Sequence, residues 1–268
     1  MRSNLGCAVL AARTGARRRS LDLVWAALSP AERAHLEREV DALDSDGVRA
    51  EWAGDTPLFY AGPLESIGPR VLAVCGAREL RQDGVRLAER AARGAVAAGA
   101  TVIAGDTEGA ETAAVATALR HGGLAVSVLA EGIRQAPSRP EAGLVTVSPS
   151  APDQPWSVDA AMARNATIAR MCTALVAIGA GGTGATLDAG MRALAAGRQV
   201  LAVGATAGSR LLVDYGATAA LDEVELTWWL DRVVAPPSPP VRSCAPAPGA
   251  RLERRYAWPP LARHWSTA

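Results

Sequence analysis

The chain has 268 residues with 28 basic and 27 acidic side chains, so its formal net charge at pH 7 is only +1. This length is enough to bury a sizeable core without disulfide or metal support. The balanced charge excludes a protein that binds nucleic acid through overall basicity, so any such contact must come from local patches. All the basic residues are arginine, whose planar guanidinium suits phosphate contacts.

The cysteines are widely separated and show no C-x-x-C spacing, which predicts neither a zinc site nor a disulfide framework and suits a reducing cytoplasm. We therefore expect a cytoplasmic protein without a metal or another cofactor. No run approaches the roughly 18 apolar residues of a membrane-spanning helix, so no membrane contact is expected. Residues 17–19 are all arginine, the wrong flank for a secretion signal, and residues 1–19 are predicted to be a flexible basic arm or the product of a mis-assigned start.

Residues 20–54 are predicted to form a small helical preface, because Ser29 and Glu32 have the spacing of a capping box. The turn-rich stretch that follows contains an apolar segment at residues 57–60, which suits a short edge strand. At the other end, residues 235–268 are too rich in proline to pack and are predicted to be a disordered tail.

Between these segments, residues 55–234 alternate continuous apolar runs of strand length with helical stretches. The runs lie at residues 70–75, 101–104, 124–130, 144–147, 174–178 and 199–203, with a last short one near Ala219. Strands that are buried on both faces and joined by helices predict a doubly wound parallel sheet, an α/β fold of Rossmann-like type. Ligands of such sheets bind at the carboxyl ends of the strands.

Three glycine-rich loops follow predicted strands and therefore share that edge. They contain Gly76, then Gly105 and Gly109, and finally Gly181, Gly182, Thr183 and Gly184. Glycine lets the backbone approach a ligand with its N–H groups, and the start of the following helix favours an anion. The loops predict a site for a nucleotide or nucleic-acid phosphate, although a tight strand-to-helix turn also favours glycine without any ligand.

Arg164 and Asn165 lie on the helix that Ser157 caps, ahead of the third glycine loop. We expect Arg164 to bind a phosphate, and Asn165 to contact a base edge, a sugar or a backbone group. The alternative for Asn165 is structural: a buried amide that ties its helix to the neighbouring loop.

The second glycine loop is acidic, since Asp106, Glu108 and Glu111 crowd one turn and the start of the next helix. In the simplest interpretation these carboxylates compensate the helix dipole. Alternatively they bind a ribose or supply a general base, and in either case they would repel a phosphate chain. No Ser-His-Asp, Cys-His or metal-ligand pattern occurs, so neither a covalent nor a metal-dependent mechanism is supported.

Ordered motifs in residues 55–225 resemble the DNA-processing protein family, DprA/Smf. The motifs are Cys75-Gly76-Ala77-Arg78 followed by Gly84, residues 104–111, Arg164-Asn165-Ala166 with residues 167–169, residues 183–189, and residues 208–217. The resemblance implies a Rossmann-like core that binds single-stranded DNA rather than catalysing a reaction. It also implies loading of a RecA-type recombinase during natural transformation, and it leaves a homodimer open.

Several positions depart from that family's pattern. Glu108 stands where the family has an arginine, Val115 where it has a histidine, Ala166 where it has the second arginine of R-N-R, and Arg210 where it has an asparagine. Loss of positive charge from a phosphate-facing pocket weakens backbone binding and flattens its salt dependence.

A second resemblance is to the lysine-decarboxylase-like LOG family of nucleoside-monophosphate phosphoribohydrolases. The matching residues are Met162, Arg164, Gly181, Gly182, Gly184 and Asp188. This resemblance implies N-glycosidic cleavage of a nucleotide, and a nucleotide sensor without activity is the third alternative. Our main hypothesis is a binding protein for single-stranded DNA or a nucleotide, with Arg78, Arg164 and Asn165 as anchors beside the glycine loops.

Overall fold

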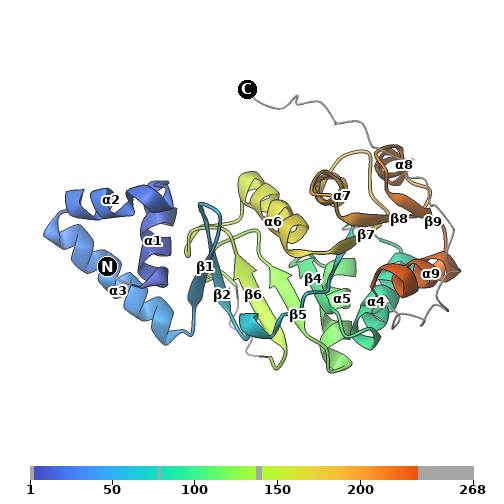
Figure 1. Ribbon diagram of the computed structural model, residues 1–268, viewed down its shortest axis with the longest axis horizontal. Helices are drawn as coiled ribbons and strands as arrows, with labels where there is room; N and C mark the ends of the chain where they lie inside the picture. Colours follow the sequence, from blue (N-terminus) through green and yellow to red (C-terminus); the bar gives the residue numbers. More distant parts are fainter. Residues whose placement is uncertain (1–2, 78–79, 137–140, 235–268) are drawn as a thin grey trace, which may run out of the picture. The chain divides into compact units, whose positions relative to one another are not determined.

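The computed structural model describes residues 3–77, 80–136 and 141–234. Within these residues, strands form a single sheet in the order β1-β2-β6-β5-β4-β3-β7-β8-β9, which Figure 1 shows with helices on both faces. The strands are β1 (Arg49–Ala53), β2 (Thr56–Ala61), β3 (Val71–Gly76), β4 (Thr101–Gly105), β5 (Ala125–Val128), β6 (Leu144–Ser148), β7 (Ala174–Ile178), β8 (Gln199–Val203) and β9 (Thr218–Ala220).

The two faces of the sheet carry separate hydrophobic cores. One core packs beneath α4 (Gln82–Ala97), α5 (Ala110–Arg120) and α9 (Glu223–Val233). The other packs beneath α6 (Val158–Met171), α7 (Ala185–Ala195) and α8 (Ala207–Asp214). The sequence of β3 is apolar throughout because both faces of the strand are buried. Leu72 and Val74 enter the first core, and Ala73 and Cys75 enter the second. The predicted doubly wound α/β fold is confirmed.

The sheet is mixed rather than wholly parallel. Strands β3 to β9 pair in parallel, whereas β1 and β2 form an antiparallel hairpin that joins β6. The strand predicted around residues 57–60 is therefore β2, but it is an inner strand, because β1 covers its outer side. The stretch Arg49–Ala53, expected within the helical preface, is that outer strand.

The prediction of a flexible arm over residues 1–19 is wrong for the part that the structure describes. Helix α1 (Asn4–Thr14) is capped by Ser3 and buries Leu5, Val9 and Leu10. These side chains share a third core with Phe59 of β2. The apolar residues that open the chain are thus core residues.

Two further helices complete the N-terminal part, α2 (Leu21–Ala27) and α3 (Pro30–Ser45). The capping box predicted at Ser29 and Glu32 is present at the start of α3. Of the helices in the described residues, none is long and apolar enough to cross a membrane. The predicted tail, residues 235–268, lies outside the described residues, as does Arg78.

Candidate functional site

The topology brings the three glycine loops to one edge of the sheet, as predicted. Strands β4, β3 and β7 are neighbours and parallel, so the loops after them start side by side. The chain runs from β3 through β4 and β5 to β6, and then returns to place β7 on the other side of β3. Such a change of direction opens a crevice at the carboxyl ends of the strands, where doubly wound proteins bind their ligands.

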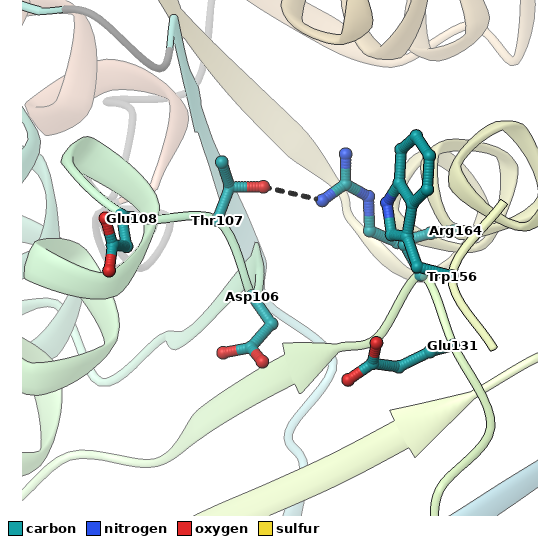
Figure 2. A pocket seen from close by; sticks show the side chains of 7 residues that line it. Asp106, Thr107, Glu108, Glu131, Trp156 and Arg164 are labelled. Carbon is teal, nitrogen blue, oxygen red and sulfur yellow. Dashed lines mark hydrogen bonds between the residues drawn. The ribbon is translucent and has the colours of Figure 1, made fainter. Parts of the chain in front are cut away.

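A cavity of about 320 Å³ opens at this edge, beside the ends of β4 and β5. Its walls come from three segments, and its lining residues are Asp106, Thr107, Glu108, Ala130, Glu131, Trp156 and Arg164. Figure 2 shows the carboxylates of Asp106 and Glu131 turned toward the same space, with the Trp156 indole beside the Arg164 guanidinium. Three carboxylates and one guanidinium make this an acidic cavity.

Arg164 lines this cavity although only 5% of its surface is exposed. Its Nη1 donates a hydrogen bond of 2.9 Å to Thr107 Oγ1 and lies 3.6 Å from Glu111 Oε2. Its Nε donates a 3.2 Å hydrogen bond to Asn165 Oδ1. The guanidinium therefore already has an anionic partner from α5, so it adds less positive charge to the cavity than the sequence suggested.

Glu111 is the buried counter-ion of Arg164. Burial raises the pKa of this carboxyl above its ordinary value, and the Arg164 charge opposes that rise only in part. Glu111 Oε2 has no hydrogen-bond partner among the described residues, so the pair is held by charge at this oxygen. Compensation of the helix dipole is not the whole role of Glu111, because its partner is a specific arginine on α6.

Gly76 and Gly105 make room for protein groups at this edge. A Cβ at Gly105 would lie 2.5 Å from Glu111 Oε2 and would also overlap Arg164 Nη1. A Cβ at Gly76 would lie 2.5 Å from the Cβ of Ala110, the first residue of α5. These two glycines are explained by the packing of α5 and of the ion pair, which is the ligand-free alternative for a glycine at a strand-to-helix turn.

Asn165 is almost fully buried and links α6 to the start of α7. Its Nδ2 donates to Asp188 Oδ2 at 2.9 Å and to the Ala185 carbonyl oxygen at 3.3 Å. The same Asp188 carboxylate accepts a 2.8 Å hydrogen bond from Arg192. Asn165 does not line the cavity, and its contacts are those of the structural alternative. Through it, the cavity residue Arg164 is linked to the start of α7.

All four residues of the third loop, residues 181–184, are exposed, and we call this segment the glycine loop. Gly184 has φ +109°, a conformation that favours glycine, and it precedes α7 without a side-chain cap. Thr206 and Gly208 bond to the Ala180 carbonyl oxygen just before the loop, which fixes its base. The first N–H groups of α7 therefore lie at an exposed helix start, where an anion is generally favoured.

Two other predicted positions have structural explanations. Gly109 has φ +101° and turns the chain into α5, so its backbone conformation alone accounts for glycine there. Ala166 does not face the cavity: it lines a separate groove of about 480 Å³ between α6 and α7, together with Arg170 and Arg192. The missing second arginine of the motif therefore leaves the cavity unchanged.

Residues 50–227 match the sequence model of the family described as DNA recombination-mediator protein A. The chain belongs to this family. The DprA/Smf resemblance inferred from the motifs is thereby confirmed. Among curated proteins, none matches the sequence.

Several solved structures share the fold, two of them DNA processing proteins A. DNA processing protein A from Streptococcus pneumoniae is 25% identical, with a TM-score of 0.55 over 63% of this chain and 65% of that one. The chain thus spans less than two thirds of that relative. DNA processing protein A from Helicobacter pylori is 14% identical, with a TM-score of 0.58 over 68% of this chain and 90% of that one. The molybdenum cofactor binding protein from Rippkaea orientalis is 15% identical, with a TM-score of 0.50 over 63% and 100% of the two chains.

The sequence analysis did not single out four lining residues as site candidates, namely Thr107, Ala130, Glu131 and Trp156. The position of Glu131 could have been predicted, because it directly follows the predicted strand at residues 124–130 and therefore lies at the same edge of the sheet. Trp156 stands directly before the helix cap Ser157, but nothing in its neighbours distinguishes a cavity residue from a solvent-facing one.

Proposed function

We propose that this protein binds single-stranded DNA at the carboxyl edge of β4, β3 and β7. The observation that carries the proposal is the exposed glycine loop at the start of α7, joined through Asn165 to the cavity that Arg164 closes. DNA processing protein A from Helicobacter pylori binds single-stranded DNA. A family fold with an open anion site at the same edge supports the same ligand class here.

In this proposal the loop backbone and the α7 start contact a phosphate, while the cavity receives a group that tolerates carboxylates. Phosphates are repelled from the cavity by Asp106, Glu108 and Glu131, and the one guanidinium among the lining residues is paired with Glu111. Few phosphates are then neutralised by cations, so the affinity should depend only weakly on salt. The slope of log affinity against log salt concentration is about 0.7 for each phosphate that a cation contacts.

We propose binding rather than catalysis at this site. The thiol of Cys75, at the end of β3, is fully buried, and burial raises its pKa well above the ordinary value. It therefore stays protonated and is not an activated nucleophile. A RecA-type recombinase as partner, a homodimer and action in the cytoplasm remain predictions that accompany the DNA-binding proposal.

A second candidate is a site for one free nucleotide, and the cavity itself favours it. Its volume of about 320 Å³ lies in the range of small-molecule sites, and Asp106 and Glu131 could stabilise an oxocarbenium-like sugar, as N-glycosidic cleavage requires. Incubation with AMP and with cytokinin-type nucleotides separates the two candidates. Released free base supports the phosphoribohydrolase, and nucleotide binding without release supports a sensor.

The DNA-binding proposal is tested by fluorescence anisotropy with a labelled oligo-dT at two salt concentrations. Thr183→Asp places a negative charge in the glycine loop and is expected to weaken binding by about tenfold or more, because like charges repel at an interface. Thr218→Asp is the matched control, since Thr218 is an exposed threonine on the edge strand β9. Equal affinity in both variants, or no binding by the wild type, contradicts the proposal.

A further inference from the structure

The cavity combines groups that suit a nucleobase better than a phosphate. The carboxylates of Asp106 and Glu131 are turned toward the cavity, and the Arg164 guanidinium lines it from another side, beside Thr107 (Figure 2). A carboxylate accepts hydrogen bonds, and a guanidinium donates them. The cavity therefore presents acceptors on one side and a donor on another, which is the complement of a base edge that carries both an amino group and ring acceptors.

Trp156 gives this cavity an aromatic wall. Its side chain is 57% exposed although tryptophan is usually largely buried, and it lines the cavity with the acidic residues. Ser157 directly after it caps α6 and fixes the chain at this point. An indole held beside an open cavity offers a stacking surface of the kind that single-stranded nucleic-acid sites use.

We propose that this cavity selects a nucleobase with an exocyclic amino group, stacked on Trp156 and donating to Glu131 and Asp106. The proposal rests on the proposed DNA-binding function and names the part of the strand that the cavity reads. Acidic side chains are the usual acceptors for the cytosine N4 amino group. Thymine has a carbonyl oxygen at the same ring position, which a carboxylate repels.

Cytosine and thymine give the sharpest comparison, because they have the same ring size and differ at this position. Oligo-dC and oligo-dT of equal length are titrated by anisotropy at mildly alkaline pH, where oligo-dC stays single-stranded. We expect oligo-dC to bind at least about fivefold more tightly, the lower end of the discrimination that one good base contact supplies. Equal or weaker binding of oligo-dC overturns the proposal.

Substitutions of Glu131 and Trp156 test whether these residues cause the preference for oligo-dC. Glu131→Gln keeps the size of the side chain but replaces the charge with an amide that can donate, so oligo-dC should lose its advantage and oligo-dT, no longer repelled, should bind more tightly. Trp156→Ala should weaken both oligonucleotides by about fivefold or more. Trp228→Ala is the matched control, because Trp228 on α9 is also 57% exposed but lies outside the cavity.

The outcomes separate this inference from the proposed function. If neither oligonucleotide binds, the DNA-binding function itself fails. If oligo-dT binds as tightly as oligo-dC, the function stands and the base selectivity is wrong. If the preference persists in Glu131→Gln, or if Trp228→Ala weakens binding as much as Trp156→Ala, the cavity is not the reading site and the proposal is overturned.

Discussion

The cavity and the glycine loop meet at the same edge of the sheet, yet they differ in what supplies their chemistry. The cavity is built from side chains, and the one guanidinium among its lining residues, that of Arg164, is paired with Glu111. The glycine loop is built from backbone, with four exposed residues ahead of α7. Side chains change charge by single substitutions, whereas a helix start keeps its polarity whatever residues surround it. The difference explains how a family member can carry an acidic cavity beside a helix start whose polarity still favours an anion.

The largest expected effect tests the buried pair on the cavity side. Arg164→Ala leaves Glu111 buried without its counter-ion and should lower the free energy of unfolding by about 3–5 kcal/mol. Urea unfolding followed by circular dichroism measures it. The double variant Arg164→Met with Glu111→Leu removes both charges and should regain most of the loss. A small loss of unfolding free energy in Arg164→Ala would mean that the Arg164–Glu111 ion pair does not form in solution.

The next effect compares the stability cost of a glycine substitution beside the cavity with that of one in the glycine loop. Gly105→Ala forces a Cβ against the Arg164–Glu111 pair and should destabilise the protein by about 1–3 kcal/mol. Gly182→Ala places its Cβ 3.6 Å from Ala207, an ordinary contact, and should change stability by less than about 0.5 kcal/mol. Similar values for the two variants would show that Gly105 is not confined by the pair. The measurement is the midpoint of urea unfolding at constant slope.

A charge reversal then tests whether acidity limits DNA binding at the cavity. Glu108→Arg puts a cation where the family has one, and it should tighten oligo-dT binding and steepen the logarithmic salt dependence by about 0.7, the value for one phosphate contact. Glu65→Arg, at an exposed acidic position ahead of β3, serves as the control for added charge alone. An equal gain from both variants would contradict the assignment of the cavity to the binding site.

The smallest effect is the pH dependence that Glu111 confers. Its folded-state pKa is raised above the ordinary value, so the folded state holds the proton more tightly than the unfolded state. Stability should therefore decline as pH rises from the ordinary carboxyl pKa toward the folded-state pKa, and level off above it. Glu111→Gln should remove this decline. Urea midpoints measured across that window check it, and an unchanged slope in the variant would assign the decline to another group.

Much of the fold was predictable because strand and loop signals are local. Buried runs such as residues 174–178 have the length and composition of inner strands, and the glycine loops after three of the strands indicated the edge where a ligand is expected. The prediction of a flexible N-terminal arm was wrong because the contacts of this segment are not local. The partners of Leu5 and Leu10 include Phe59, and no local pattern states that a short apolar helix will meet a distant strand.

The candidate site was predictable in place but not in charge. The sequence predicted Arg164 beside the glycine loops, and in the structure it contacts Thr107 of the second loop. The motifs could not show that Glu111 neutralises it, since the pair joins α5 to α6 across the sheet edge. Likewise, Asn165 had two plausible uses, and only the contacts with Ala185 and Asp188 distinguish them.

The most direct test of the account is a map of backbone amide exchange with and without oligo-dT. If single-stranded DNA binds at this edge, exchange should slow in the glycine loop and the first turn of α7, and in residues 106–108 beside the cavity. Helices α1 and α9 should exchange as in the free protein. Protection that appears on those helices and spares the glycine loop would contradict the central claim.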